Sequence, residues 1–187
     1  ARPTPQFNGP PPMTIDAEAT YLATIETSCG SYVAELRPDI APVAVNSFVF
    51  LAQKGFYDGL TFHRILKGFV IQGGDPLGDG SGGPGYRYEI ETSPKQTFDA
   101  AGLLAMANSG QPGSSGSQFF VTLDPTPDLD PVDGNGGYTI FGEVTKGLDV
   151  VERIGKVATT RSPATGEPSV PTQAVYIESV TIEERPA

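Results

Sequence analysis

Alternating apolar and polar positions predict a β-hairpin near the start of the chain. Every second residue from Tyr21 to Ile25, and again from Tyr32 to Leu36, is apolar and falls on one face of an extended strand. The sequence between these runs, SCGS at 28–31, has the small and polar residues that favour a turn. We therefore expect two antiparallel strands, each with one buried face.

A helical period follows the hairpin. Pro42 suits the first turn of a helix, and Gly55 is placed to end it after about three turns. The apolar positions of this segment recur every three or four residues and form one stripe, which is expected to be core: Val45, Phe48, Val49 and Ala52.

The rest of the chain consists of short apolar runs separated by loops rich in glycine, proline and serine. Two strands are expected within residues 61–75, one on each side of Lys67 and Gly68, and a second, short helix at 148–154. The other expected strands are 86–91, 103–107, 117–123, 138–144 and 174–182, and the loops are 75–85, 108–116, 124–137 and 162–172. About eight strands and two helices without a βαβ rhythm predict a mainly β fold, a closed and mostly antiparallel sheet with helices at its ends.

One domain is expected, because 187 residues with 38% hydrophobic content fit a single core. Residues 1–19, which include RPTPQFNGPPP, are predicted to be a proline-rich tail or linker, residues 20–184 the domain, and residues 185–187 a C-terminal tail. The absent initiator methionine, the proline-rich leader and the acidic composition favour an extracytoplasmic or membrane-tethered bacterial domain over a cytoplasmic one.

Charge and residue usage exclude several classes of function. A net charge of −10 without any lysine or arginine cluster argues against nucleic-acid binding. A single cysteine and a single histidine, Cys29 and His63, exclude an intramolecular disulfide, a zinc site with three or more cysteine or histidine ligands, and a histidine-based triad that lacks His63. Cys29 lies in the predicted turn and is interpreted as incidental.

Three local motifs are too incomplete to assign a function. The glycines at 78, 80 and 83 match the dinucleotide fingerprint, but Pro84 and Gly85 follow where that motif must open a helix. The acidic run at 128–135 resembles a calcium loop, but its acids are out of step with an EF-hand and Thr139 stands at the closing position. No G-x-S-x-G elbow is present, so a serine hydrolase is not supported.

The segment 61–75, TFHRILKGFVIQGGD, contains the most informative charge of the chain. Arg64 lies among apolar residues, and a guanidinium, which keeps its proton, is costly to bury without a partner. It is either an edge-strand arginine with its head in water or a group that contacts a ligand. Gln72 and the glycines after it favour the second interpretation, since backbone without Cβ atoms permits close approach.

The candidate site combines an arginine, two amides and two aromatic rings: Arg64, Gln72, Asn108, Phe69 and Phe120. This set contains no obvious acid, base or nucleophile. One reaction compatible with it makes no covalent bond and transfers no proton. His63, although adjacent to Arg64, is interpreted as a structural, hydrogen-bonded histidine.

Six short runs, in the expected order, resemble the cyclophilin family of peptidyl-prolyl isomerases: FHR at 62–64, GFVIQGGD at 68–75, GGPG at 82–85, MAN at 106–108, GSQFF at 116–120 and FGEV at 141–144. The similarity extends over residues 22–182. It implies an eight-stranded antiparallel barrel capped by two helices, acceleration of rotation about X–Pro bonds in polypeptide substrates, no cofactor or metal, and a monomer.

The resemblance also implies roles for individual residues. Arg64 is the catalytic arginine by this likeness, and Gln72 and Asn108 match the residues that hold the substrate backbone. The residues that correspond to the proline pocket are Phe69, Val70, Phe120 and Leu129, with Tyr138 where a histidine is common. The groove for residues before proline corresponds to Gly80, Ala107, Ser109 and Gln118.

The chain departs from the family pattern at one rim of this pocket. Asp128 stands where a tryptophan associated with cyclosporin binding is common, and the chain has no tryptophan. Weak cyclosporin binding with retained isomerase activity is therefore expected. The loop 124–137 is longer than usual and acidic, which would bias the groove toward basic substrates.

Two rival functions stay open from the sequence. One is a binding module or chaperone that holds proline-containing segments without turnover, and the other is a regulatory domain anchored through the proline-rich tail. Intact Arg64, Phe69, Gln72 and Phe120 favour the enzyme.

Overall fold

The hairpin predicted at the start of the chain forms the first two strands of a curled sheet. The structure, a computed structural model, describes residues 4–93, 96–131 and 136–187. Within these residues the α-helices are α1 (Pro42–Gln53) and α2 (Leu148–Gly155), and η1 (Pro127–Leu129) is a short 3-10 turn. The strands are β1 (Thr20–Thr27), β2 (Gly30–Leu36), β3 (Arg64–Leu66), β4 (Val70–Gly73), β5 (Leu103–Met106), β6 (Phe119–Thr122), β7 (Ile140–Lys146), β8 (Thr159–Arg161), β9 (Pro168–Pro171) and β10 (Ile177–Arg185).

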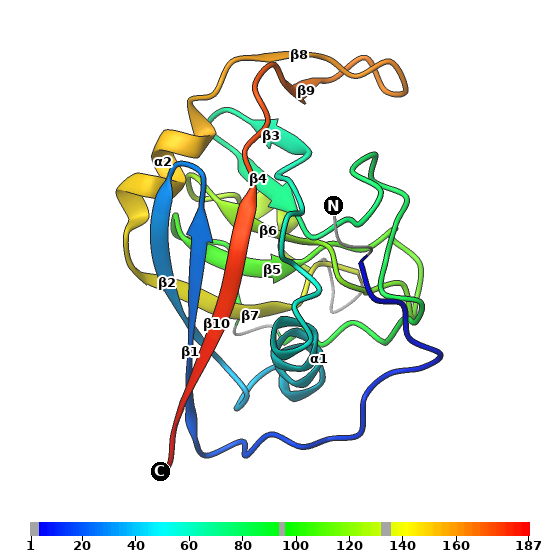
Figure 1. The fold of residues 1–187 in the computed structure, drawn as a ribbon, viewed down its shortest axis with the longest axis vertical. Helices are drawn as coiled ribbons and strands as arrows, with labels where there is room; N and C mark the ends of the chain where they lie inside the picture. Colours follow the sequence, from blue (N-terminus) through cyan, green and yellow to red (C-terminus); the bar gives the residue numbers. More distant parts are fainter. Residues whose placement is uncertain (1–3, 94–95, 132–135) are drawn as a thin grey trace.

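Eight of these strands form one antiparallel sheet in the order β10-β1-β2-β7-β5-β6-β4-β3 (Figure 1). Its edge strands, β3 and β10, do not pair with each other in the described residues. The segment before β3 instead meets the start of β10 and the residues before it: the Phe62 N–H donates to the Val175 carbonyl at 3.0 Å, and the Ile177 N–H donates to the Leu60 carbonyl at 2.7 Å. The predicted mainly β fold with eight antiparallel strands and two helices is confirmed, but the barrel is completed by these irregular segments and is not strictly closed by strands.

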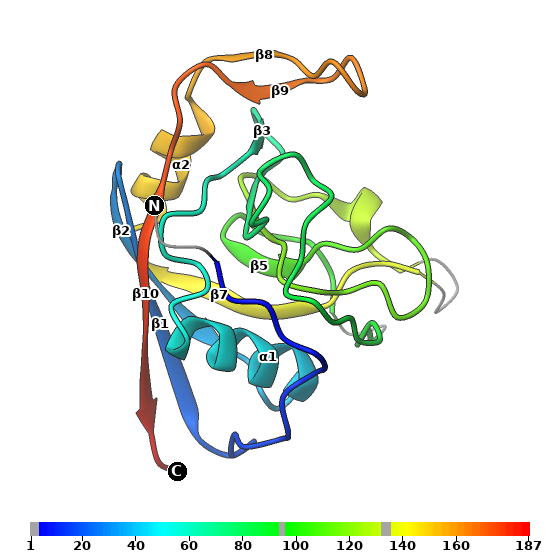
Figure 2. The same cartoon turned by 45° about the vertical axis from the view of Figure 1, so that its right-hand side comes forward.

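The main core lies between the curled sheet and α1, which cover opposite sides of it (Figure 2). All four residues of the predicted helical stripe are buried. The ring of Phe48 lies 5.6 Å from that of Phe119 in β6 and 5.1 Å from that of Phe141 in β7, measured between centroids. Burial of large aromatic rings from the helix and both strands is the main force that fixes α1 against the sheet.

The predicted strand at 86–91 is wrong. In this segment Tyr88 makes one isolated bridge to Ser115, and the remaining residues are irregular. Glu91 has a different structural task, because its carboxylate accepts the N–H groups of Val43 and Ala44 at 3.0 and 2.9 Å. These donors lie in the first turn of α1, where no side chain of the helix caps them, so Glu91 supplies the missing acceptor.

A second correction concerns residues 162–172, which were expected to be a loop. β8 and β9 pair as a small separate two-stranded sheet that lies beyond β3, at the top of Figure 1. The strands are three and four residues long, and β9 begins and ends with proline, so no alternation marks them in the sequence. The turn that joins them carries Glu167.

Residues 4–19, within the predicted proline-rich tail or linker, contain no helix or strand but are bonded to the domain. The ring of Phe7 packs edge-on against Phe50 of α1 at 4.9 Å, and its N–H donates to the Pro84 carbonyl at 2.9 Å. Asn46 accepts the N–H of Thr14 at 3.0 Å and donates to the Pro12 carbonyl at 3.0 Å. These contacts attach the described part of the leader to the domain, and the predicted division of the chain at residue 19 stays a prediction.

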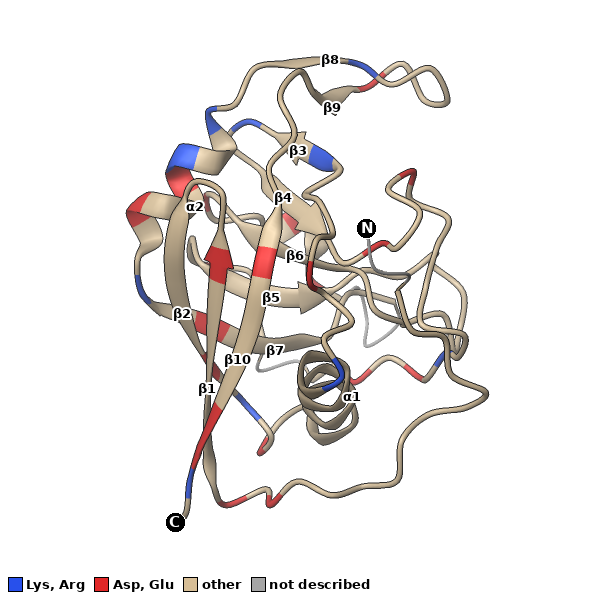
Figure 3. Cartoon of the chain, in the orientation of Figure 1, with Lys and Arg blue, Asp and Glu red and all other residues tan. Residues whose placement is uncertain are grey.

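Charged side chains are scattered over the surface that the structure describes. Lysine and arginine lie singly on β3, α2, β8 and the ends of other elements, with acidic residues between them (Figure 3). None of the described helices has the length and apolar character needed to cross a membrane.

Candidate active site

A row of register partners brings the predicted catalytic residues together. Arg64 of β3 is opposite Gln72 of β4, and Gln72 is opposite Phe120 of β6. Directly opposed residues in antiparallel strands project from the same face of the sheet. Three residues that are far apart in the chain therefore lie side by side on neighbouring strands.

Arg64 makes a bidentate ion pair that the sequence did not predict. Its Nε donates to Oε2 of Glu167 at 2.8 Å and its Nη2 donates to Oε1 at 2.9 Å. The hydrogen bonds from Arg64 lower the pKa of the Glu167 carboxyl below its ordinary value, so the carboxylate is ionised near neutral pH. On the other edge of the guanidinium, Nη1 donates to Oε1 of Gln72 at 3.1 Å.

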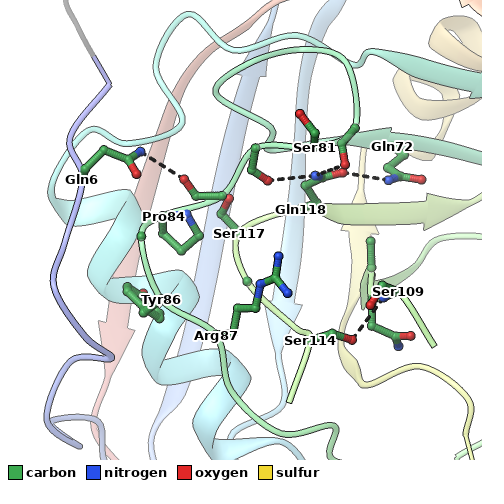
Figure 4. Close-up of a pocket in the computed structure, with 17 residues that line it drawn as sticks. Gln6, Gln72, Ser81, Pro84, Tyr86, Arg87, Ser109, Ser114, Ser117 and Gln118 are labelled. Atoms are coloured by element: carbon green, nitrogen blue, oxygen red, sulfur yellow. Dashed lines mark hydrogen bonds between the residues drawn. The ribbon is translucent and has the colours of Figure 1, made fainter. Parts of the chain in front are cut away.

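The amide of Gln72 continues this chain of hydrogen bonds into the next loop. Its Nε2 donates to Oε1 of Gln118 at 3.0 Å, and Nε2 of Gln118 donates to the carbonyls of Gly80 and Gly82, each at 2.9 Å (Figure 4). The orientation of each amide is set by its neighbour. Because the loop beyond Gly80 is tied to the row of Arg64 and Gln72, these groups behave as one fixed polar surface.

The loop 75–85 is held from its inner side by Asp75. This buried carboxylate accepts the N–H groups of Leu77, Asp79 and Gly80 at 2.8, 3.0 and 2.6 Å. Three main-chain donors to one acceptor fix the loop conformation and place the Gly80 carbonyl for Gln118.

A second, smaller apolar cluster lies next to this polar row. Its buried members are Val70, Phe98, Ala105, Phe120 and Ile140, and the half-buried residues packed on it are Phe69, Leu103, Ala107, Leu129 and Tyr138. All five residues assigned from the sequence to the proline pocket are in this set. The rings of Phe120 and Tyr138 meet edge to face at 5.4 Å, which gives the pocket an aromatic wall.

Phe98 belongs to this cluster although sequence reasoning missed it. Its ring is fully buried and stacks on Phe120 at 5.9 Å between centroids. The residue lies in an irregular polar segment with no periodicity. An isolated aromatic residue in such a segment is the one signal that would have drawn attention to it.

A groove of about 680 Å³ adjoins the apolar cluster (Figure 4). Every residue predicted for the positions before proline lines it, together with Gln72 and Asn108: Gly80, Ala107, Ser109 and Gln118. Ala107 also packs on the apolar cluster, so the groove borders that cluster there. Gln6 forms part of the wall and donates to the Gly83 carbonyl at 3.0 Å, a contribution of the leader that the sequence did not indicate.

The side chain of Asn108 is engaged within the protein. Its Nδ2 donates to the Gly137 carbonyl at 3.0 Å, and its Oδ1 accepts the Gly110 N–H at 2.9 Å. The amide thus fixes the loop that borders the groove.

His63 does not have the hydrogen bonds expected of a structural histidine. Neither ring nitrogen has a partner among the described residues, and burial lowers the pKa of the imidazole below its ordinary value. The charged groups that act on the ring are Asp75, Arg64 and Asp79. Burial therefore favours the neutral form of this imidazole.

The acidic loop lies partly outside the described residues, which omit 132–135. Within the described part, Asp128 is exposed on η1 and Leu129 packs on the apolar cluster, as the alignment of the rim implied. Over the described ranges, no group of three or more histidine, cysteine, aspartate or glutamate residues is placed to hold a metal ion.

The chain matches the family model described as cyclophilin type peptidyl-prolyl cis-trans isomerase over residues 22–182. It is 45% identical over 181 residues to peptidyl-prolyl cis-trans isomerase A of Mycobacterium tuberculosis, which covers 88% of this chain and 93% of the relative. Peptidyl-prolyl cis-trans isomerase-like 1 of Mus musculus is 49% identical over 152 residues, which are 80% of this chain and 86% of the relative.

Solved structures give the same result for the fold. A crystal structure of a cyclophilin type peptidyl-prolyl cis-trans isomerase of Cryptosporidium parvum superimposes with a TM-score of 0.78 at 32% identity and covers 89% of this chain and 99% of that one. The same protein in the presence of the dipeptide Ala-Pro superimposes with a TM-score of 0.77 at 32% identity, over 88% of this chain and 99% of that one.

Proposed function

The chain belongs to the cyclophilin-type peptidyl-prolyl cis-trans isomerase family, and we propose that Arg64, Gln72 and the pocket around Phe120 perform this isomerisation. The observation that supports this assignment most strongly is their register on β3, β4 and β6. It puts an arginine donor, an amide and an apolar pocket in one row. A proline ring in the pocket would have its nitrogen on the side of the guanidinium.

The chemistry needed is the loss of amide resonance. Rotation about a peptide bond has a barrier of about 18–20 kcal/mol, and X–Pro bonds isomerise over tens to hundreds of seconds. At the top of the barrier the bond is twisted, and the proline nitrogen carries a lone pair that is delocalised in both planar states. A fixed N–H donor near that nitrogen stabilises the twisted state more than the planar ones, which lowers the barrier.

Arg64 has donors left for this task. A guanidinium carries five N–H groups, of which Glu167 accepts two and Gln72 accepts one. One N–H on Nη1 and one on Nη2 are then available to a substrate. A reduction of the barrier by about 7 kcal/mol would accelerate rotation roughly 10⁵-fold.

The pocket and groove divide the work of holding the substrate. The apolar cluster with Phe69, Val70 and Leu129 takes the proline ring, while Gln72 and the main chain of Asn108 hold the flanking backbone. The groove past Ala107 takes the residues before proline. Because the substrate chain before proline and the proline ring are both held, the motion left to the substrate is rotation about the X–Pro bond.

Further proposals concern inhibitor binding, substrate preference, oligomeric state and cellular location. Asp128 replaces an aromatic platform with a hydrated carboxylate, which supports weak cyclosporin binding. The exposed acids of the loop after β6, such as Asp124 and Asp128, support a preference for substrates with basic residues near proline. For the oligomeric state we propose a monomer. For the location we propose an extracytoplasmic or membrane-tethered domain of a bacterial protein.

Exchange NMR separates catalysis from simple holding of proline segments. An Ala-Pro-containing peptide is mixed with about one hundredth of its concentration of protein, and cis and trans resonances are followed. Catalysis gives cis-to-trans exchange cross-peaks that are absent from the peptide alone. A protein that only holds the peptide gives shifts in proportion to the bound fraction and no exchange, which would overturn the proposal.

A further inference from the structure

Glu167 is the one acidic side chain in the described residues that forms an ion pair with Arg64. Both carboxylate oxygens are used, on Nε and Nη2, in the side-on fork that gives an arginine–carboxylate pair a defined plane as well as a defined distance. The two side chains are each about one-third exposed, at 32% and 31%, so the pair lies at the margin of the site and not in the core.

The main chain holds Glu167 in place on the β8–β9 hairpin. The Glu167 carbonyl accepts the N–H groups of Ser162 and Ser169 at 2.8 and 2.9 Å. Gly166, just before it, has a φ of 72° and donates to the Ser162 carbonyl at 2.8 Å, a turn that a residue with a Cβ would strain. The carboxylate is therefore presented by a defined turn.

Glu167 contacts the Arg64 guanidinium on the edge that lies away from Gln72. Nε and Nη2 form one edge of a guanidinium, and Nη1 lies on the other. Glu167 occupies the first edge, from the hairpin beyond the edge strand β3, whereas Gln72 meets Nη1 from β4. Phe120 is one strand further in the same direction as Gln72. Glu167 thus lies behind Arg64 with respect to the proline pocket, and it leaves one N–H on Nη1 and one on Nη2 unoccupied.

We propose that Glu167 is a positioning residue, whose carboxylate locks the plane of the Arg64 guanidinium so that its remaining N–H groups face the proline nitrogen. This inference rests on the proposed role of Arg64. A long, flexible side chain such as that of Arg64 loses conformational entropy when it is fixed in one orientation. Because Glu167 fixes Arg64 in the folded protein, this entropy is lost on folding and not again at each turnover. Gln72 restrains the opposite edge of the guanidinium by accepting from Nη1, and Gln118 in turn fixes the amide of Gln72.

The test compares Glu167→Ala and Glu167→Gln with wild type in isomerisation of an X–Pro peptide. Glu167→Ala should lower kcat about tenfold and leave KM within twofold, because the pocket and groove are unchanged. Glu167→Gln keeps one acceptor oxygen and should recover part of the loss, at about threefold below wild type. Glu152→Ala and Glu152→Gln are the controls, since Glu152 is an exposed acid on α2 and its removal should leave kcat unchanged.

A spectroscopic readout separates positioning from a general structural effect. In wild type the Nε–H resonance of Arg64 should be shifted and slow to exchange, because a carboxylate accepts it. Glu167→Ala should abolish this signature while the remaining amide spectrum is retained. Wild-type kcat in Glu167→Ala, or a higher kcat, overturns the inference.

Failure of this inference can be told apart from failure of the proposed function. If Arg64→Ala is inactive while both Glu167 variants turn over like wild type, Glu167 has no positioning role and the role of Arg64 stands. If Arg64→Ala turns over like wild type, the proposed role of Arg64 fails and this inference fails with it.

Discussion

The ring of Phe98 stacks on the ring of Phe120, with 5.9 Å between centroids and 23° between planes. The main chain of Phe98 is fixed on both sides of its Cα, since its N–H donates to Oδ1 of Asp130 at 2.7 Å and its carbonyl accepts the Thr126 N–H at 2.8 Å. A residue from an irregular loop therefore supports the ring of Phe120, which we propose as a wall of the proline pocket.

Replacing Phe98 should damage the pocket as well as the fold. Phe98→Leu removes the stacked ring but keeps an apolar side chain of most of its volume, so we expect a several-fold rise in KM for X–Pro peptides and a loss of about 1 kcal/mol in unfolding free energy. Phe98→Ala should cost about 3–5 kcal/mol of stability. Peptide titrations and urea unfolding measure the two effects.

The matched control for Phe98 is Phe56→Leu, a fully buried ring in the main core. It should lower stability to a similar extent with KM unchanged. Equal KM values for Phe98→Leu and Phe56→Leu would contradict a role of Phe98 in the pocket.

Asp128 predicts how the protein responds to cyclosporin. The wild type should be inhibited weakly, and Asp128→Trp should bind the inhibitor at least tenfold more tightly, because an aromatic surface replaces a hydrated carboxylate at the rim. Asp128→Ala serves as the control for loss of charge alone. Tight inhibition of the wild type, measured in the same isomerase assay, would sink this prediction.

The leader should contribute to the stability of the domain. Phe7 is half-buried against Phe50 and Tyr86, so Phe7→Ala should reduce the free energy of unfolding by about 1–3 kcal/mol. Met13 is a large apolar residue of the same segment that is 55% exposed, and Met13→Ala should change stability little. Indistinguishable urea midpoints for the two variants would contradict this contribution of the leader to stability.

His63 predicts a pH dependence of stability near neutrality. Burial lowers the pKa of its imidazole in the folded state, so the unfolded chain binds a proton at higher pH than the folded one. The free energy of unfolding should fall as the pH drops below about 6.5, the ordinary pKa of histidine, and this loss should stop below the folded pKa. His63 is the sole histidine of the chain, so His63→Gln should flatten the profile between pH 7.5 and 5.5. An identical slope in wild type and variant would contradict a buried neutral ring.

Local patterns were enough to predict most of the sheet. The hairpin of β1 and β2, the helix begun by Pro42 and the two strands around Lys67 and Gly68 each have a clear period and a clear boundary, and the structure contains all of them. The strands of the β8–β9 hairpin are too short and too rich in proline to carry a period. Residues 86–91 look like a strand because Tyr86 and Tyr88 alternate with polar residues. In the structure, however, the two tyrosines are buried in the core, and Glu91 binds the first turn of α1 instead of pairing in a sheet.

Some residues of the candidate site could also be predicted from the sequence, whereas others could not. Arg64, Gln72 and Phe120 could be selected because Arg64 lies among apolar residues and because all three lie in runs that resemble a family. That their strands are neighbours in the sheet is shown only by the structure. Phe98, Glu167 and Gln6 come from loops and from the leader, where only the three-dimensional arrangement brings them to the site. No spacing along the chain indicates that residue 167 reaches residue 64.

The most direct test of this account is the isomerisation rate of an X–Pro peptide with wild type, Arg64→Ala and the control Arg185→Ala. Arg185 is an exposed arginine at the end of β10, paired with Glu183. Removing a catalytic donor should lower kcat of Arg64→Ala by roughly 10²–10³, with the peptide still bound and the unfolding transition preserved. Arg185→Ala should retain wild-type kcat. An Arg64→Ala protein that is folded and isomerises the peptide at the wild-type rate would contradict the account.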